Sequence, residues 1–150
     1  GSLFQSTYKG SDEVKHKTKF DNVFVANFLC GYEFNFGSQN KNSFSIDVRT
    51  TRAGGLRYTP IDLAQSQLML QEIRDWTKAY SLQYPDYKRV DLKAAVSINS
   101  KHITQQFIIV VENIFNTKNI MQQFYEPNKG TIHTDYQLGL FPYGAYRIEF

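Results

Sequence analysis

The end of the chain, residues 136–150, alternates between apolar and polar side chains with a period of two residues. Tyr146, Ile148 and Phe150 share one parity, whereas Arg147 and Glu149 take the other. A β-strand produces this period, because successive side chains point to opposite faces of its sheet. The apolar face reaches the last residue, although the ends of soluble domains usually fray. The pattern therefore predicts a last strand over about 131–150 that stays in a sheet up to its final aromatic residue.

The same period recurs along most of the chain and predicts an all-β fold. Its clearest example is 20–36, where aromatic side chains of even number alternate with more polar neighbours. A helix would scatter these aromatic side chains around its circumference, whereas a strand collects them on one side. We expect an antiparallel meander of about six long strands. The predicted strands cover 3–9, 20–36, 43–51, 86–99, 104–113 and 131–150.

The connections between these strands alternate in length. Those at 37–42 and 99–102 are short, whereas 51–84 is long and 113–130 is intermediate. Short turns at one end and long loops at the other are typical of outer-membrane β-barrels. A strand over 20–36 would be roughly 55 Å long at about 3.3 Å per residue. Tilted by about 45°, it would rise roughly 40 Å, more than the apolar band of about 25 Å requires.

The long connection contains the start signal of a helix. Thr59-Pro60-Ile61-Asp62 places proline at the first helical position and a carboxylate three residues after a threonine. An apolar stripe follows at helical spacing, formed by Met69, Ile73, Trp76 and Tyr80. The pattern predicts a helix within 62–80 that packs on the rim of a barrel or on neighbouring loops, with direct ligand contact as the alternative.

Composition excludes several classes of protein. A chain of 150 residues has room for one domain, and 17 basic against 14 acidic residues do not indicate a nucleic-acid partner. The densest basic stretch, 15–19, is predicted to be a solvated loop, with a phosphate-binding patch as the alternative. Cys30 is the single cysteine, which excludes an intramolecular disulfide and a cysteine-based zinc site. No apolar run reaches the roughly 18 residues that a transmembrane helix needs.

No arrangement of residues predicts catalysis, a metal site or a cofactor. We expect surface roles for His16, His102 and His133, and no phosphate-binding or nucleophile motif is present in the sequence. Charged residues share the polar faces of the predicted strands, where opposite charges on neighbouring strands can pair across the sheet. These residues are Asp47, Arg49, Arg89, Asp91, Lys93, Arg147 and Glu149. We interpret them as the wall of a wet lumen and not as an active site.

Three segments carry a resemblance to a known family. Residues 52–63 contain Gly-Gly-Leu-Arg-Tyr-Thr-Pro-Ile-Asp, 85–92 read Pro-Asp-Tyr-Lys-Arg-Val-Asp-Leu, and 112–116 read Glu-Asn-Ile-Phe-Asn. In this order, and followed by the aromatic C-terminal strand, they resemble the C-terminal portion of TonB-dependent outer-membrane receptors of the type common in Bacteroidetes. The resemblance spans most of 20–150.

The resemblance implies a function in energised nutrient uptake across the outer membrane. Such receptors have a barrel of 22 strands around a plug, and residues 1–150 would form the C-terminal, closing part of that barrel domain, without the plug. The implied partners are the rest of the barrel and the plug, outer-membrane lipid, the barrel assembly machinery, the inner-membrane TonB complex acting through the plug, and a surface lipoprotein. Nucleic acid is not among them. Tyr146, Ile148 and Phe150 would form the C-terminal assembly signal.

Orientation follows from the same resemblance. The residues expected to face lipid are Phe24, Phe28, Tyr32, Phe34, Phe44, Ile46, Val48, Leu92, Val96 and Ile98. The long connection would lie outside the cell, with Arg57, Tyr58 and Trp76 at the mouth of the receptor. The smallest membrane barrels have about eight strands, and six would leave two open edges in hydrocarbon. We therefore expect the tail of a longer receptor or a truncated reading frame, inactive as a transporter in isolation. No secretory signal is recognisable, which fits a mature piece or a fragment.

Two other classes of protein stay open. The same alternation suits a soluble ligand-binding barrel or sandwich, because a strand pattern does not say which face lies inside. In that case the phenylalanine-rich faces would form a dry core and the charged faces would meet water. An enzyme is the third class, and no positioned acid, base or nucleophile supports it.

Overall fold

The computed structural model describes residues 1–11 and 13–150, and most of these lie in antiparallel β-structure. The chain divides into two compact units. Unit 1 comprises 1–26, 52–87 and 118–137, and unit 2 comprises 27–51, 88–117 and 138–150. The all-β prediction is confirmed.

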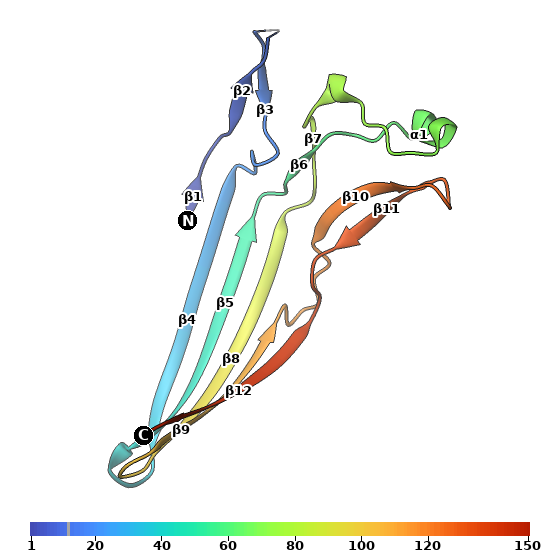
Figure 1. Cartoon of the computed structure of the whole chain (residues 1–150). Coiled ribbons are helices and arrows are strands. Elements are labelled where there is room, and N and C mark those ends of the chain that lie inside the picture. Colours follow the sequence, from blue (N-terminus) through green and yellow to red (C-terminus); the bar gives the residue numbers. More distant parts are fainter. Residues whose placement is uncertain (12) are drawn as a thin grey trace. The chain divides into compact units, whose positions relative to one another are not determined.

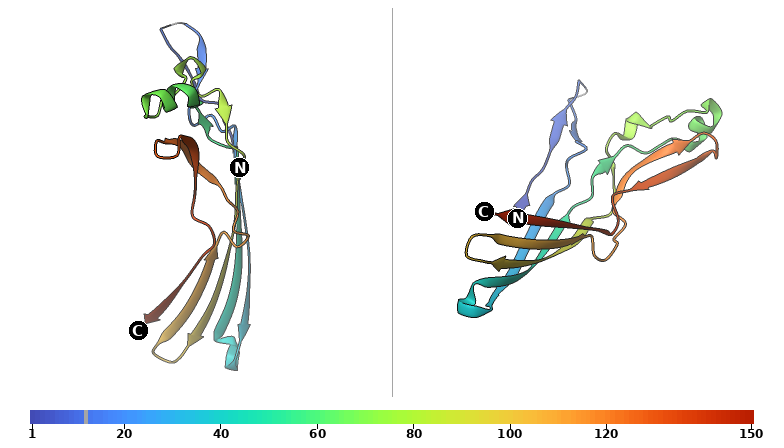
Figure 2. Two further views of the ribbon diagram at one scale, coloured as in Figure 1. Left: turned by 90° about the vertical axis from the view of Figure 1, so that its right-hand side faces the viewer. Right: turned by 60° about the horizontal axis from the view of Figure 1, so that its bottom comes forward.

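The main sheet contains six strands in the order β1-β4-β5-β8-β9-β12. Apart from the two-residue β1 (Ser2–Leu3), they are long: β4 spans Phe24–Phe36, β5 Asn42–Ala53, β8 Tyr87–Asn99, β9 Thr104–Glu112 and β12 Phe141–Glu149. Within unit 2 the strands lie side by side in one layer (Figures 1 and 2). This arrangement confirms the antiparallel sheet of six strands. The order ends at β1 and β12, so these strands form its edges.

The two short connections are tight, as the spacing predicts. A 3₁₀ turn, η1 (Ser38–Asn40), joins β4 to β5, and Gly37 before it has a φ of 84°. This positive φ favours glycine, whereas a Cβ on Gly37 would lie 2.9 Å from the Asn42 side-chain nitrogen Nδ2, which can move aside. The connection from β8 to β9 closes with a hydrogen bond from Ser100 N to Ile103 O of 2.9 Å.

Unit 1 holds the remaining elements, all of them short. Three two-stranded antiparallel sheets pair β2 (Thr7–Lys9) with β3 (Lys15–Lys17), β6 (Arg57–Tyr58) with β7 (Leu82–Gln83), and β10 (Ile120–Glu126) with β11 (Thr131–Tyr136). Between β6 and β7 lie the helix α1 (Leu63–Met69) and the 3₁₀ turn η2 (Trp76–Lys78).

The predicted helix within 62–80 is only partly correct. α1 begins as expected, because the Asp62 carboxylate caps it by accepting a hydrogen bond from Gln65 N. It ends after seven residues at Leu70, whose φ is 53°. The Ser66 hydroxyl then accepts a 2.9 Å hydrogen bond from Ile73 N and turns the chain back. The apolar stripe from Met69 onward is therefore not one helical face.

Three strand boundaries differ from the prediction because alternation does not reveal where a chain leaves a sheet. The predicted strand 131–150 is two strands, β11 and β12, and the first partners β10, which lies inside the predicted 113–130 connection. The predicted strand 3–9 divides into β1 and β2, and β3 occupies part of the predicted loop 10–18, in which residue 12 lies outside the described residues. β4 starts at Phe24 instead of residue 20, after a turn in which Val23 has a φ of 70°.

Little of the described chain is a conventional apolar core. Ala95 in unit 2 and Tyr125 in unit 1 are the buried hydrophobic residues among those described. The buried polar residues outnumber them and include Asp21, Arg57, Thr59, Ser66, Asp91, Asn113 and Asn119. Each unit is therefore held together largely by backbone ladders and by polar side chains that bond to them.

Candidate functional site

One face of the unit 2 sheet carries apolar side chains in rows that cross the strands. Val96 lies opposite Phe107, which lies opposite Tyr146, and the Phe107 and Tyr146 rings are 4.7 Å apart. Leu92 lies opposite Val111 in a parallel row. Directly opposed side chains in antiparallel strands are neighbours, so these rows form a continuous surface, here called the apolar face.

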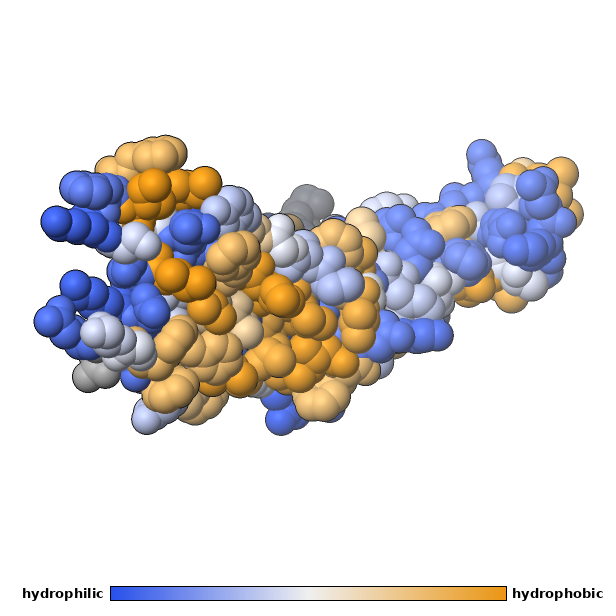
Figure 3. Space-filling model, turned by 90° about the horizontal axis from the view of Figure 1, so that it is seen from below, coloured by the Kyte–Doolittle hydropathy of each residue, from blue (hydrophilic) through white to orange (hydrophobic). Residues whose placement is uncertain are grey.

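The apolar face is open. Phe28 is 64% exposed, Tyr32 72% and Phe34 52%, and Figure 3 shows apolar side chains gathered over a broad part of one view. The other side chains predicted to face lipid are also half-buried or exposed: Phe24, Phe44, Ile46, Val48, Leu92, Val96 and Ile98. In unit 1, the guanidinium of Arg52 lies 5.8 Å from the ring of Phe24. Lipid contact by this set stays a prediction.

The predicted assembly signal lies on and beyond the edge strand β12. Tyr146 is 53% exposed, Ile148 is 42% exposed, and Phe150, one residue past the strand, is 97% exposed. Glu149 pairs with Thr104, so the C-terminus lies beside the short β8–β9 connection. Its recognition by an assembly machinery stays a prediction.

The opposite face of the unit 2 sheet is charged, and ion pairs join its neighbouring strands. Arg49 Nη2 lies 2.7 Å from Asp91 Oδ2, and Lys93 Nζ lies 3.2 Å from Asp47 Oδ2. These contacts confirm that opposite charges pair between neighbouring strands. Arg89 bridges further, to Asp91 at 2.9 Å and to Glu112 at 3.5 Å. Most of these groups are partly exposed, so each pair contributes only about 0–1 kcal/mol.

Asp91 is the exception on the charged face because it is buried, at 5% exposed. Besides the two arginines, its Oδ1 accepts a 3.0 Å hydrogen bond from Asn113 N. A shallow cavity of about 390 Å³ lies over this network. It is lined by Leu29, Asp47, Arg49, Asp91, Leu92, Lys93, Val110, Glu112 and Tyr143. Acidic and basic side chains are therefore both held in place along this cavity. Among its lining residues, no nucleophile lies beside a base.

Asn113 also organises the start of the β9–β12 connection. Its side-chain amide donates to Thr117 O at 2.9 Å and to Leu138 O at 3.2 Å, and its Oδ1 accepts from Thr117 N at 2.9 Å. Asn113 and Asn116 have φ of 51° and 50°, a conformation that asparagine tolerates better than most residues. The Asn-Ile-Phe-Asn segment at 113–116 is thus a structural corner, which the sequence analysis did not predict, although its two asparagines are a signal that could have indicated it.

In unit 1 the Gly-Gly segment at 54–55 passes very close to other backbone. A Cβ on Gly54 would lie 1.8 Å from Asn22 O, and one on Gly55 would lie 1.8 Å from Tyr84 O. Both distances are far inside van der Waals contact, so no side chain fits at either position without a backbone shift. The two glycines bring the 52–63 segment against the loop before β4 and the loop after β7.

Arg57 and Asp21 form a buried ion pair just beyond these glycines. Arg57 Nε donates to Asp21 Oδ2 at 2.9 Å, and the two residues are 8% and 1% exposed. Asp21 Oδ1 accepts from Ser6 N at 3.2 Å. Burial alone would raise the pKa of Asp21, but the hydrogen bonds from Ser6 and Arg57 and the charge of Arg57 outweigh it and hold that pKa below its usual range.

Side chains of the 52–87 region also bond the outer edge of β10. The Tyr84 hydroxyl accepts from Gln123 N at 3.0 Å, the Glu72 carboxylate accepts from Tyr125 N at 3.1 Å, and Arg74 Nη2 donates to Gln123 O at 3.1 Å. These three side chains take the place of a neighbouring strand beside β10. They join the connection between β5 and β8 to the connection between β9 and β12. Burial is the main cause of a raised pKa for the Tyr84 hydroxyl.

The three residues predicted at the receptor mouth have different environments. Trp76 is 66% exposed, and Tyr58 stacks on Tyr84 with ring centroids 4.1 Å apart. Arg57 is buried against Asp21, so in this structure its guanidinium joins segments of unit 1 and does not face solvent. Substrate contact by these residues stays a prediction, and the geometry favours Trp76 over Arg57. The spacing within 52–63 does not reveal the buried partner, Asp21.

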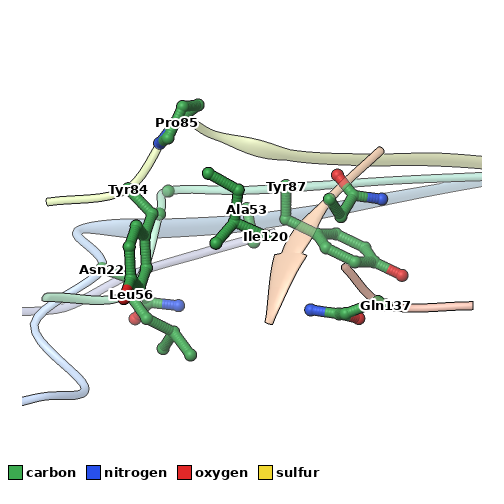
Figure 4. Close-up of a pocket in the computed structure, with 11 residues that line it drawn as sticks. Asn22, Ala53, Leu56, Tyr84, Pro85, Tyr87, Ile120 and Gln137 are labelled. Atoms are coloured by element: carbon green, nitrogen blue, oxygen red, sulfur yellow. The ribbon is translucent and has the colours of Figure 1, made fainter. Parts of the chain in front are cut away.

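A cavity of about 200 Å³ lies in unit 1 beside the two glycines. Figure 4 shows Asn22, Leu56, Tyr84 and Ile120 among the side chains around it. None of its eleven lining residues is an acid, a lysine, an arginine or a histidine. The cavity can therefore hold a small neutral group, and its titratable lining residues are Tyr84 and Tyr87.

Two of the histidines lie on strands, and for His16 the sequence predicted a loop. His16 lies in β3 and His133 in β11. His133 Nε2 is 3.5 Å from Asp135 Oδ1, and its Nδ1 is 3.8 Å from Glu126 Oε2, two neighbours that the sequence interpretation missed. Within 1–11 and 13–150, no group of three or more histidine, cysteine or acidic side chains could hold a metal ion.

No helix among the described residues is both long and apolar enough to cross a membrane. Comparisons of the chain with protein-family models, with curated proteins and with solved structures found no match. The family resemblance therefore depends on the three segments and the C-terminal strand alone.

Proposed function

We propose that the chain forms the C-terminal wall of a TonB-dependent outer-membrane receptor barrel that takes up a nutrient. The observation that carries the proposal is the two-faced sheet of unit 2, in which long strands present an open apolar face on one side and an ion-paired face on the other. A wall between lipid and a wet lumen requires this division.

The apolar face supports a membrane environment on energetic grounds. Exposing apolar surface to water costs about 25 cal/mol per Å². Large side chains such as Phe28, Tyr32 and Phe34 are more than half exposed, and within the described residues nothing covers them. Acyl chains would remove this cost, whereas the charged face would need water or a polar partner.

The edges of the sheet support a longer barrel. β12 pairs with β9 on one side and is the last strand in the order. Unpaired backbone groups in hydrocarbon cost several kcal/mol each, so a membrane sheet must close. We assign the missing strands to the rest of a 22-stranded barrel. A plug, the TonB complex, the assembly machinery and a surface lipoprotein complete its set of partners.

The connections support one orientation in the outer membrane. Consecutive antiparallel strands alternate direction, so the two short turns lie at one end and the two long connections at the other. In outer-membrane barrels the short turns face the periplasm and the long loops face the outside. Under this proposal Trp76 lies in an extracellular segment. The chain would transport nothing without the remaining strands and the plug.

The proposal can be tested with the native cysteine. Cys30 has even number in β4 and lies on the apolar face, while Leu29 lies next to it on the charged face. A fluorescent maleimide on Cys30 is compared with the same label on a Cys30→Ser, Leu29→Cys variant. Both chains are refolded into phosphatidylcholine vesicles with brominated acyl chains, which quench fluorophores in the hydrocarbon. The protein concentration is kept high enough for copies of the chain to pair through their edge strands, because an open sheet edge is unfavourable in hydrocarbon.

We expect strong quenching at position 30 and weak quenching at position 29, because the two labels would share a depth but face opposite sides. Equal quenching at both positions contradicts the proposed orientation. A detergent-free, soluble monomer with neither label quenched would favour the soluble ligand-binding barrel or sandwich.

A further inference from the structure

The β2–β3 hairpin of unit 1 gathers lysines on one face. Its register pairs Thr7 with Lys17, Tyr8 with His16 and Lys9 with Lys15. Because side chains alternate between faces, the three lysines share one face with Thr7. Here this set, Lys9, Lys15 and Lys17, is called the lysine face. The predicted solvated loop at 15–19 is thus in part a strand that presents ordered charges.

On the lysine face, two positive charges lie directly opposite each other on neighbouring strands. Lys9 and Lys15 are Cα partners, and side chains in such pairs stand about 4.5–5.5 Å apart at Cβ. Both residues are exposed, and among the described residues neither has a carboxylate within 4.0 Å. The charge of Lys17 is partly compensated, because its Nζ lies 3.8 Å from Asp21 Oδ2. Like charges directly opposite destabilise a hairpin, and an isolated hairpin is marginal, so a bound anion would stabilise this one.

Hydrogen bonds nevertheless fix the base of the hairpin. Ser6 N donates to Asp21 Oδ1, Thr18 Oγ1 donates to Ser6 Oγ at 2.8 Å, and Phe4 N donates to Val23 O at 2.9 Å. The last bond connects it to the residue before β4. These contacts hold the strands that carry the lysines in register instead of leaving them on a free loop.

Exposed aromatic side chains accompany the lysines. Tyr8, on the other face of the hairpin, is 43% exposed, while Phe4 and Phe20 near its base are 39% and 65% exposed. Aromatic rings beside lysines that extend into water characterise the interface between hydrocarbon and headgroups. A soluble anion would need no such rings, so the combination favours a lipid as the source of the anion.

We propose that the lysine face binds the phosphate groups of a membrane lipid headgroup. The inference rests on the proposed function, since the start of β4 then marks the boundary of the apolar band. Lysine acts here as a compact point charge toward phosphate. Glu13, near the tip of the hairpin, is exposed and opposes the attraction, so the site depends on the lysines together.

The test measures partition of the chain into two kinds of vesicle, phosphatidylcholine alone and phosphatidylcholine with phosphatidic acid. The variant Lys9→Gln, Lys15→Gln removes two charges from the lysine face. The control Lys78→Gln, Lys129→Gln removes two charges from the same unit, at exposed lysines that pair with Asp75 and Glu126. The variant Lys9→Arg, Lys15→Arg keeps the charge and tests whether the hairpin tolerates substitution.

We expect phosphatidic acid to strengthen partition of the unmodified chain, and Lys9→Gln, Lys15→Gln to lose about tenfold or more of that preference. The control and the arginine variant should keep most of it. Equal losses in the Lys9/Lys15 variant and the control would overturn the site, because general charge would then explain binding. An affinity for inorganic phosphate in solution equal to that for phosphatidic acid in vesicles would overturn the lipid as ligand in favour of a soluble phosphate.

Failure of the site and failure of the proposed function give different results. If the chain enters both kinds of vesicle equally and the Cys30 label is quenched, the proposed function stands and the lysine face is wrong. If the chain enters neither kind and the label is not quenched, the membrane assignment fails and the inference fails with it.

Discussion

The two units of the chain achieve order by different means. Unit 2 relies on long ladders whose alternation repeats over many residues, so no single side chain specifies it. Unit 1 has short elements, and its loops are fixed by buried polar groups such as Asp21, Thr59 and Ser66. Away from the buried Asp91 and Asn113 of unit 2, a single substitution should therefore disturb unit 1 far more than unit 2, which makes the difference testable.

The largest effect is expected for Asp21→Ala. It removes the carboxylate that faces Arg57 and leaves a buried guanidinium without its partner, which typically costs about 3–5 kcal/mol. Asp86→Ala is the control, because it breaks the exposed Arg52–Asp86 pair and should cost about 1 kcal/mol or less. Hydrogen exchange at the amides of β6 and β7 would measure both, and equal protection would show that the buried pair does not hold unit 1.

The same contrast explains what could be predicted from the sequence. The strands of unit 2 were expected within a few residues because period-two alternation is a local property, visible at Phe28 and Phe34 without knowledge of any partner. The Asp21–Arg57 pair joins residues 36 positions apart, and no local pattern connects them. The break between β11 and β12 was missed for a related reason. Tyr136 and Leu138 keep the parity of the strand, while Gln137 N bonds to Asn119 O outside the main sheet.

In unit 2 the two faces should respond differently to charge. Phe28→Asp places a carboxylate on the apolar face, whereas Asn27→Asp places it one residue away on the charged face, where Asn27 Oδ1 already accepts from Thr51 Oγ1 at 2.9 Å. We expect Phe28→Asp to weaken insertion into phosphatidylcholine vesicles by up to about 2 kcal/mol, roughly thirtyfold, and Asn27→Asp to have little effect. Equal insertion of both variants would contradict the assignment of the faces.

Acid should weaken unit 1 through Asp21, whose pKa is lowered in the folded state. A carboxyl group with a depressed pKa contributes stability above its unfolded pKa, and loses it as the pH falls through the folded value. We therefore expect protection of the β6 and β7 amides to fall below about pH 4, the ordinary range of an aspartate. Asp21→Ala should remove most of this pH dependence, and an unchanged profile in that variant would assign it to another group.

The smallest effect on the folded structure is expected at the C-terminus. Phe150 is 97% exposed and lies beyond β12, so its deletion removes no packing contact of note and should leave the ladder between β12 and β9 unchanged. Under the proposed function its role is in assembly, because the aromatic end of the last strand would be the signal that the machinery reads. Deletion of Phe150 should therefore slow appearance of a membrane-inserted, protease-resistant form in cells that export the full receptor.

Phe115→Ala is a matched control for the deletion of Phe150, since Phe115 is 71% exposed in a connection and not in a terminal strand. Slower assembly in both variants would point to a general loss of apolar surface. Unchanged assembly after the deletion would remove the terminal aromatic from the proposal.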